Sequence, residues 1–517
     1  MDGSGDGTTD WGIFGRPIFE DPSARALSRV GVVDVGSNSV RLVVFDGAAR
    51  SPAYFFNEKI MCALGAGLRE TGKLNPLGRE RALTAIKRFQ LMAEGMGLAP
   101  LTAVATAAVR EAEDGPDFCA QVERETGLRI WTIDGEEEAR LSAQGVLLGW
   151  PEAGGLVCDI GGASMELAEL RDGKVWRRVT SPLGPLKLLD IKGGKKAIKA
   201  QIKTVLDGLV EEMGRNNKRL YLVGGSWRAI ARLDMERRNY PLHVLHEYRM
   251  TPSDIRKTVK WIRENDLNEL RGRTGTSEAR MSLVPIASEV LRQLVRAFKP
   301  KEIAVSSYGI REGMLYEQMP DRVKSRDPLI EACYFAEAKD ARLPGFGRSL
   351  NQFILPLFGS MRPEQKRILK AACLLHDVTW RAHPDFRADV CFDNATRANL
   401  GGLKHSERIW LGLALMHRYR NNRDHSRYSD LFDLLHQEDI LRAEVAGKAM
   451  RFGAMFSVED PRTVATLKWQ SQKKLLTLSL TDKGAGLFAE VAQARFKSLA
   501  SSLDAETVIK QMRTPRT

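Results

Sequence analysis

The sequence predicts an α/β protein with a duplicated, two-lobed fold, followed by an all-α C-terminal domain. Two observations support the duplication: residues 33–45 and 158–170 repeat one pattern, and the same order of strands and helices follows each copy. Helical periodicity, which dominates after about residue 327, supports the C-terminal domain. The expected organisation is a disordered tail (1–29), lobe I (30–147), lobe II (148–316) and a helical domain (317–517).

The repeated pattern is a short β-branched run, an aspartate, a turn of small residues and an alternating apolar strand. This order is typical of a β-hairpin. At an offset of 125 residues four identical pairs coincide: Asp34 with Asp159, Gly36 with Gly161, Ser39 with Ser164, and Leu42 with Leu167.

The elements that follow each hairpin also correspond. Third strands are expected at 53–57 and 175–180. In the first half, Asn75-Pro76 opens a helix, a strand follows at 101–106, a second helix runs from Gly115-Pro116 to Gly127, and a strand occupies 130–133. In the second half, helical runs near 185–214 precede a strand at 220–223.

Composition limits the class of protein and its partners. The chain has 517 residues and a net charge of +13, which favours a polyanionic partner such as nucleic acid, an acidic membrane or polyphosphate. No apolar stretch is long enough for a membrane span and the N-terminus lacks the pattern of a secretory signal, so we expect a cytoplasmic protein with no membrane partner. The 6 cysteines are scattered, which predicts buried free thiols.

The small-residue turns are candidates for phosphate binding. Successive backbone N–H groups in such turns form a concave site for phosphate oxygens. Gly36, Gly161 and Gly162 are expected to supply positive φ angles. A third turn, at 224–226, follows a strand and opens a helix, and either a phosphate site or an ordinary strand-to-helix turn fits it.

The aspartate that opens each hairpin turn predicts a cation. A carboxylate repels phosphate, so Asp34 and Asp159 need a cation between them and the substrate, and Mg²⁺ suits carboxylate, water and phosphate ligands. The alternative is that each aspartate only caps its own turn.

Candidates for activating water follow the strand at 130–133. Glu136, Glu137 and Glu138 open a helix, where carboxylates also serve as caps, and this reasoning does not choose among them. Glu166 lies inside the second hairpin, and Arg110 has the forked charge that matches phosphate oxygens.

At residues 30–316 the chain resembles the exopolyphosphatase / guanosine pentaphosphate phosphohydrolase family, within the actin–sugar kinase–chaperone ATPase superfold. The resemblance is carried by these motifs: Asp34-Val35-Gly36-Ser37-Asn38-Ser39 with Arg41-Leu42, Leu64-Gly65-Ala66-Gly67-Leu68 with Thr71-Gly72, Ala105-Thr106 through Arg110, Glu137-Glu138-Ala139-Arg140, Asp159-Ile160-Gly161-Gly162-Ala163-Ser164-Met165-Glu166, Gly224-Gly225-Ser226 and Arg311-Glu312-Gly313. It implies an actin-like (ribonuclease H-like) fold. Ala163 and Met165 depart from the family's usual loop.

The resemblance also implies roles for residues. Glu138 is the expected water-activating carboxylate, with Glu137 as the neighbouring candidate. Asp159 and Glu166 are the expected Mg²⁺ carboxylates, and the hairpin argument above adds Asp34. The phosphate contacts that the resemblance implies are Arg110, Ser37, Asn38, Ser39, Gly161, Gly162 and Ser164. Further candidates in the same motifs are Gly36, Arg41, Gly224, Gly225 and Ser226.

The C-terminal third contains a helical run at 364–375 that ends in His376-Asp377, as in HD-type metal phosphohydrolases. No histidine lies between 247 and 375, so a metal site here is expected to be incomplete. We expect an HD-like structural module that extends a polyanion groove or forms the contact of a homodimer.

A lysine cluster after the second hairpin favours a long polyanion as substrate, although a solvated helix face has the same pattern. It comprises Lys187, Lys192, Lys195, Lys196, Lys199 and Lys203, opposed by Asp190. The expected function is that of an exopolyphosphatase: processive release of terminal phosphate from inorganic polyphosphate by a glutamate-activated water, assisted by Mg²⁺. The alternatives are a guanosine pentaphosphate 5′-phosphohydrolase, alone or as a second activity, a non-catalytic polyphosphate or nucleotide sensor, and an ATP-using enzyme.

Overall fold

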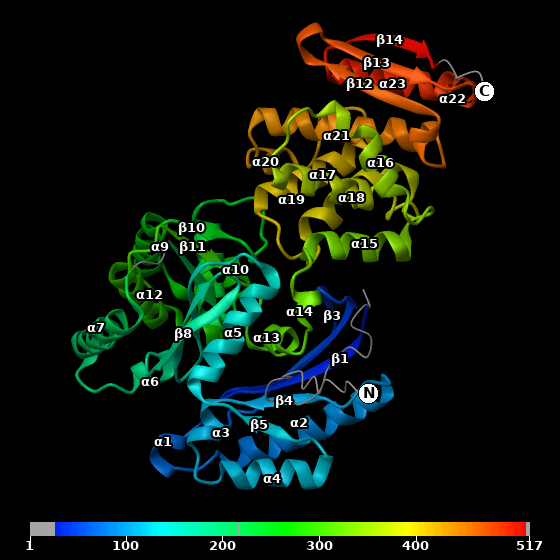
Figure 1. Ribbon diagram of the computed structural model, residues 1–517. Helices are drawn as coiled ribbons and strands as arrows, with labels where there is room; N and C mark the ends of the chain where they lie inside the picture. Colours follow the sequence, from blue (N-terminus) through cyan, green and yellow to red (C-terminus); the bar gives the residue numbers. More distant parts are fainter. Residues whose placement is uncertain (1–25, 216–217, 513–517) are drawn as a thin grey trace, which may run out of the picture. The chain divides into compact units, whose positions relative to one another are not determined.

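The computed structural model describes residues 26–215 and 218–512. The chain divides between Asp327 and Pro328 into two compact units (Figure 1). Of the predicted N-terminal tail, residues 26–29 begin strand β1 (Ala26–Val35), so the expectation of disorder is wrong there, and residues 1–25 lie outside the described part. The predicted boundaries at 147/148 and 316/317 fall inside two helices that pack together, α5 (Gly135–Gly149) and α13 (Ile310–Glu317).

The first sheet of the N-terminal unit has five strands in the order β3-β2-β1-β4-β5. Strands β1, β2 and β3 are antiparallel, whereas β4 and β5 continue the sheet in parallel. Its further strands and helices are β2 (Ser39–Ala48), β3 (Ser51–Met61), α1 (Leu68–Thr71), α2 (Pro76–Gly95), β4 (Thr102–Ala105), α3 (Ala107–Glu111), α4 (Gly115–Thr126) and β5 (Ile130–Thr132). Val33 and Leu42 of the sheet share one buried core with Phe89 of α2 and Phe118 of α4.

Local sequence explains where these helices begin and end. The Asn75 side chain accepts a hydrogen bond from the Gly78 N–H (2.9 Å) at the start of α2, where Pro76 occupies the first helical position. Helix α4 ends at Gly127, whose φ of 70° is in the left-handed region that favours glycine. Both helix positions were predicted from the sequence.

The second sheet has six strands in the order β10-β11-β9-β6-β7-β8. It repeats the first arrangement: β6 and β7 form an antiparallel hairpin, and β9 pairs with β6 in parallel, as β4 does with β1. The predicted duplication is confirmed. The elements of this half are β6 (Gly155–Ile160), β7 (Met165–Arg171), β8 (Lys174–Ser181), α6 (Pro185–Leu189), α7 (Gly194–Met213), β9 (Arg219–Val223), α8 (Gly225–Arg237), β10 (Arg249–Met250), α9 (Pro252–Glu264), α10 (Leu267–Thr274), α11 (Glu278–Met281), α12 (Val284–Phe298) and β11 (Glu302–Val305).

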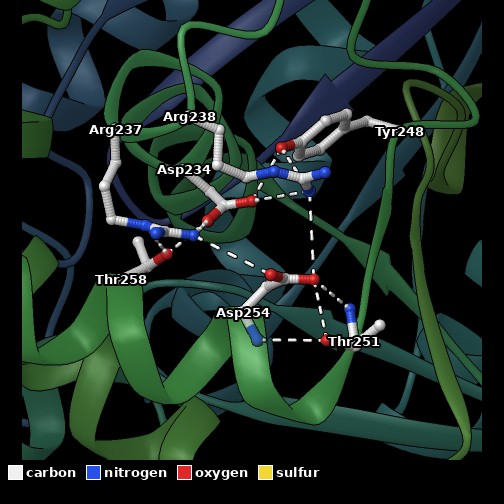
Figure 2. A network of polar contacts seen from close by, with 7 residues as sticks. All are labelled: Asp234, Arg237, Arg238, Tyr248, Thr251, Asp254 and Thr258. Carbon is white, nitrogen blue, oxygen red and sulfur yellow. Dashed lines mark hydrogen bonds and ion pairs between the residues drawn. The ribbon is translucent and has the colours of Figure 1, made fainter. Parts of the chain in front are cut away.

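A buried polar network connects α8 to α9 (Figure 2). The Asp234 carboxylate is 0% exposed and accepts hydrogen bonds from Tyr248 Oη (2.6 Å), Arg237 Nη2 (2.7 Å) and Thr258 Oγ1. Arg238 Nη1 lies 3.5 Å from the same carboxylate. Because two arginines compensate one buried aspartate, this network stabilises the helices that cover the second sheet.

The two halves of the N-terminal unit are also joined through Arg50, which is 0% exposed. Its guanidinium donates to the carbonyls of Leu148 (2.6 Å), Leu147 (3.2 Å) and Lys324 (3.1 Å). The first two carbonyls belong to the last turn of α5, where the helix dipole is negative and favours a cation.

The C-terminal unit is mainly helical, as predicted, but the expectation that it is all-α is wrong. Its last strands form a three-stranded sheet in the order β12-β13-β14. In β12, Ala465 and Leu467 are buried while Thr466 and Lys468 are exposed. This alternation is typical of a strand, and the prediction of an all-helical domain did not take it into account. Strand β14 pairs in parallel with β13 across α22 and α23, so its partner is not adjacent in sequence.

The N-terminal unit ends with α14 (Asp321–Lys324). The elements of the C-terminal unit are α15 (Pro328–Asp340), α16 (Phe346–Ile354), α17 (Pro363–Leu375), α18 (Arg387–Arg397), α19 (His405–His417), α20 (Ser429–Phe432), α21 (Gln437–Phe456), β12 (Ala465–Gln470), β13 (Leu475–Leu480), α22 (Asp482–Leu487), α23 (Glu490–Ser502) and β14 (Glu506–Gln511). Within the described residues, no helix has the length and apolarity needed to cross a bilayer. Five cysteines are buried free thiols, as predicted, and Cys119 is half-buried.

Candidate active site

The two hairpin turns have the same geometry. The Gly36 N–H donates to the Ser39 carbonyl (3.0 Å), and the Gly161 N–H donates to the Ser164 carbonyl (3.0 Å). In the β1–β2 pair Asp34 lies opposite Arg41, and in the β6–β7 pair Asp159 lies opposite Glu166. The equivalent position therefore holds a cation in the first hairpin and a carboxylate in the second.

The expectation that Gly36, Gly161 and Gly162 adopt positive φ is wrong, since none of them does. The reason is that each hairpin turn is closed by a backbone hydrogen bond whose geometry needs no residue with a positive φ angle. The left-handed glycine is Gly224, with φ 109°, in the turn between β9 and α8. A Cβ at Gly224 would lie 2.9 Å from Asp159 Oδ1, so glycine allows this third turn to pass directly beside the second hairpin.

A neighbouring loop braces the first turn. The Gly65 N–H donates to the Ser37 carbonyl (2.8 Å), and the Cys62 and Ala63 N–H groups both donate to the Asn38 carbonyl (3.0 Å each). These bonds use the backbone of Ser37 and Asn38, and they leave the Asn38 side chain exposed. The Leu64–Gly67 motif therefore positions this turn.

Glu138 lies in the first turn of α5, which Asp134 caps by accepting a hydrogen bond from the Glu137 N–H (2.7 Å). Glu138 Oε2 is buried and accepts no hydrogen bond within the described part of the chain. Arg110 Nη1 lies 3.7 Å from this oxygen. Burial, and then the carboxylates of Glu166 and Asp159, raise the pKa of Glu138 well above its usual range, while Arg110 lowers it.

Asp159 and Glu166 are held by hydroxyl groups that the sequence analysis missed. Ser142 Oγ donates to Asp159 Oδ2, and Thr180 Oγ1 donates to Glu166 Oε1 (3.1 Å). Ser142 follows Glu138 by four residues on α5, a spacing that places both on one helix face and could have identified it. Burial and the Asp159 charge raise the pKa of Glu166 to about 8.

Asp34 brings the first hairpin to the same site. Arg311 Nη1, from α13, lies 3.5 Å from Asp34 Oδ2, and the Arg311 Nε is buried without a hydrogen-bond partner in the described residues. Burial raises the pKa of Asp34, and Arg311 and Arg41 lower it. Asp34 in turn helps to raise the pKa of Asp159. The two aspartates thus interact electrostatically across the duplicated fold.

Further arginines surround these carboxylates. Arg228, on α8, donates to the Ser306 carbonyl (3.3 Å), and burial followed by the Arg311 and Arg280 charges lowers its pKa to about 10. A guanidinium among other cations is compensated when an anion binds between them. Arg228 and Arg280 were not predicted, because nothing in their local sequence distinguishes them from surface arginines.

The site therefore gathers four carboxylates and several arginines from both halves of the N-terminal unit. The carboxylates are Asp34, Glu138, Asp159 and Glu166. Two of their oxygens, Glu138 Oε2 and Glu166 Oε2, are buried and accept no hydrogen bond in the described chain. Such an arrangement can bind phosphoryl oxygens through its arginines and deprotonate or orient a water through a carboxylate.

Other predicted residues lie differently. Glu137 pairs with Arg140 (2.5 Å), which also contacts Glu317 (2.7 Å), and Glu136 is exposed. Ser164 and Ser226 are buried, and Gly225 lies beside the Arg280 guanidinium.

The lysine cluster extends from α6 into α7. Lys187 pairs with Glu111 (3.1 Å). An Asp190 carboxylate oxygen lies 3.7 Å from Arg69 Nη1, so the negative charge of Asp190 is partly neutralised by Arg69 rather than by the lysines. Five members are exposed: Lys192, Lys195, Lys196, Lys199 and Lys203, the last of which pairs with Asp207. The cluster is therefore accessible to a polyanion.

In the C-terminal unit, His376 and Asp377 are engaged by protein groups. Arg342 contacts both Asp377 oxygens (2.5 and 2.8 Å), and His376 Nδ1 lies 2.8 Å from the Cys373 carbonyl. Burial and the Arg418 charge lower the pKa of His376 to about 4. The Arg342 guanidinium thus binds the Asp377 carboxylate, the group that an HD-type centre would use as a metal ligand.

Two family profiles match the chain. Residues 43–322 match the Ppx/GppA phosphatase family, and residues 340–507 match the C-terminal region of exopolyphosphatases. "Exopolyphosphatase 1" of Mycobacterium tuberculosis is 27% identical over 59% of this chain and 92% of its own length. "Retrograde regulation protein 2" of Saccharomyces cerevisiae is 25% identical over 78% of this chain and 75% of its own.

Solved structures share the fold. The Ppx/GppA family member of Aquifex aeolicus has a TM-score of 0.50 at 24% identity, covering 56% of this chain and 97% of that protein. An exopolyphosphatase of Cytophaga hutchinsonii has a TM-score of 0.51 at 23% identity, covering 56% of this chain and 98% of that protein. These likenesses confirm the predicted actin-like fold.

Proposed function

The chain belongs to the Ppx/GppA phosphatase family, and from this premise we propose that it is an exopolyphosphatase that removes terminal phosphate from inorganic polyphosphate. The observation that carries the proposal is Glu138: its buried Oε2 accepts no hydrogen bond from the described residues, and the carboxylate lies among three others and beside Arg110. Exopolyphosphatases are among the similar proteins, and they support this choice of substrate.

We assign the activation of water to Glu138. A general base works best when its pKa approaches the operating pH, and burial with neighbouring carboxylates raises the pKa of Glu138 in that direction. Water bound to Glu138 Oε2 would lose its proton to that oxygen as it attacks the terminal phosphorus. Arg110 lies close enough to contact the phosphoryl group and to restrain the Glu138 carboxylate.

Arg41, Arg228 and Arg311 are proposed to hold the phosphoryl oxygens with the hairpin turns. Arg311 is an electrostatic neighbour of both Arg41 and Arg228, and its charge lowers the pKa of each of them. The end of a polyphosphate chain brings several negative charges to these arginines. The arginines stabilise the transition state more strongly than the bound substrate, because the leaving phosphate gains negative charge in the transition state.

The oxygen donors also fit Mg²⁺. The described residues contain no group of three histidine, cysteine, aspartate or glutamate side chains placed for metal binding. One or two carboxylates with water and substrate oxygens suffice for Mg²⁺, and the unpartnered Oε2 of Glu166, opposite Asp159, has the required chemistry. We propose Asp159 and Glu166, with Asp34 nearby, as the residues that would hold Mg²⁺. When bound, the ion would neutralise phosphate charge.

The exposed lysines in and just before α7 and the charge of +13 support a long polyanion rather than a single nucleotide. Guanosine pentaphosphate is the alternative substrate with the same chemistry. A homodimer and a cytoplasmic location remain predictions from the sequence.

The test follows product length from polyphosphate of one defined chain length, with guanosine pentaphosphate assayed in parallel. An exopolyphosphatase releases orthophosphate while intermediate chains are scarce, as expected for processive attack from an end. Mid-chain cleavage, or better turnover of guanosine pentaphosphate, would reject the proposed substrate. Addition of a chelator should abolish turnover, and restoration by Mg²⁺ would support the proposed metal.

A further inference from the structure

Three arginines of the C-terminal unit carry positive charge without a carboxylate partner among residues 26–215 and 218–512. They are Arg418, at the end of α19, Arg451, on α21, and Arg495, on α23. Arg418 is only 5% exposed, and its Nε is buried without a hydrogen-bond partner in the part of the chain that the structure describes, as is the Nε of Arg495. Among the described residues, the polar side-chain contact of this group is Arg451 Nη1 to Asn421 Oδ1 (2.8 Å).

Packing contacts bring the three arginines to one place. A Cβ at Gly447 would lie 2.3 Å from His417 Cβ, so α21 touches the end of α19 directly beside Arg418. Arg451 is one helical turn after Gly447 and therefore on the same face of α21. The ring centroids of Phe452 on α21 and Phe496 on α23 are 5.3 Å apart, so these two helices pack together there. Arg451 and Arg495 each directly precede one of these phenylalanines in the sequence. In agreement, Arg495 and Arg418 both lower the pKa of Arg451, after burial, to about 10.

The nearby acidic group does not compensate these charges. Asp377 interacts with Arg418 electrostatically, but both of its oxygens are taken by Arg342. The ring of Tyr419 lies 4.9 Å from the Arg418 guanidinium and provides a weak cation–π contact. Burial of a cation without a counter-charge is costly, so the cluster is stable when an anion joins it.

We propose that Arg418, Arg451 and Arg495 form an oxyanion site that binds a phosphoryl group, supplied by inorganic phosphate or by a polyphosphate chain. A phosphoryl group brings up to about two negative charges and several acceptor oxygens to guanidinium donors, whereas a carboxylate brings one charge. The buried position of Arg418 excludes flat partners such as a membrane surface, and the half-exposed Arg451 and Arg495 leave an approach for a small anion or a chain end.

This binding site lies outside the proposed catalytic residues and does not depend on the proposed function. The test is equilibrium dialysis of the full chain with radiolabelled orthophosphate at low ionic strength. We expect Arg451→Gln and Arg495→Gln each to weaken one class of bound phosphate by about tenfold or more, because each removes a charge-assisted contact. Arg451→Lys should retain part of the binding, since it keeps the charge.

Arg442→Gln is the matched control. Arg442 also lies on α21, but it pairs with Glu438 (2.8 Å), so its removal should leave phosphate binding unchanged. Equal phosphate binding by the parent, Arg451→Gln and Arg495→Gln would overturn the proposal. So would equal losses in all variants, including Arg442→Gln, because they would indicate a general charge effect.

A second arm distinguishes the two sources of the phosphoryl group. A methylene-bridged triphosphate, which resists hydrolysis, competes for the labelled phosphate. Competition at least tenfold stronger than that of orthophosphate, lost in Arg495→Gln, supports a chain end as occupant. Equal or weaker competition supports free phosphate. Failure of polyphosphate hydrolysis would reject the proposed function and leave this binding result standing.

Discussion

Replacing Glu138 by glutamine separates catalysis from stability. The change is isosteric, and because Glu138 Oε2 accepts no hydrogen bond from the described chain, the contact of that oxygen that changes is its ion pair with Arg110 (3.7 Å). Loss of a general base lowers kcat by about 10²–10⁴-fold, which corresponds to about 3–5 kcal/mol of transition-state stabilisation. Polyphosphate binding should be nearly unchanged, because the arginines that we propose as phosphate contacts remain. Phosphate release under saturating and single-turnover conditions gives kcat, and KM and direct binding report affinity.

The same substitution should maintain or increase thermal stability. Burial and the charges of Glu166 and Asp159 raise the pKa of Glu138 in the folded state. A carboxyl whose folded pKa is raised contributes stability at low pH that is lost as pH rises through that pKa. Glutamine does not ionise, so the melting temperature of Glu138→Gln relative to the parent should improve as the pH rises above the ordinary pKa of a glutamate carboxyl.

Glu137→Gln is the matched control, one residue away. Glu137 binds Arg140, so this variant should lose stability, by about 1–3 kcal/mol, and retain kcat. The reasoning fails if Glu138→Gln keeps more than about a tenth of the parent kcat, or if Glu137→Gln loses as much activity as Glu138→Gln.

Three other predictions concern neighbouring charges. Arg110→Gln removes the cation that lowers the pKa of Glu138, so the rising limb of the plot of kcat/KM against pH should move to higher pH. Arg110→Lys keeps the charge and should move this limb less. A pH profile that is unchanged in Arg110→Gln would contradict the assignment of Glu138 as the base. Asp234→Asn leaves two arginines facing a neutral side chain and should lower the free energy of unfolding in urea by about 3–5 kcal/mol. A decrease in this free energy of less than about 1 kcal/mol would show that the network does not stabilise the fold. Replacing exposed lysines by glutamine should raise KM for long polyphosphate and flatten its salt dependence, with triphosphate as the unaffected control; equal effects on both substrates would exclude an extended track. Those lysines are Lys192, Lys195, Lys196 and Lys199.

Much of the site could be predicted because it is built from local patterns. The hairpin turns, with Asp34 and Asp159 at their starts, follow from alternation and small residues within a few positions. Glu138 was among the predicted carboxylates, and its partner Arg110 was also identified. The choice between Glu137 and Glu138 depended on the Arg140–Glu317 pair, which spans 177 positions.

The residues that sequence reasoning missed act from a distance along the chain. Arg228 and Arg280 reach the site from α8 and α11. Strand β14 pairs with β13 only after two helices, so the final sheet could not be recognised from the local pattern of 506–511 alone. The φ angles of Gly36 and Gly161 depend on how the hairpins close rather than on glycine itself.

The sequence alone determined the duplicated α/β order, the positions of most helices and strands, and the types of residue able to bind phosphate. These properties arise from hydrogen bonding and side-chain periodicity over a few neighbouring residues. The tertiary structure decided which charges meet: Asp34 with Arg311, Glu138 with Arg110, and Asp377 with Arg342. Burial and electrostatic energy depend on the distance between groups in space, and folding brings together charges that lie far apart in the chain.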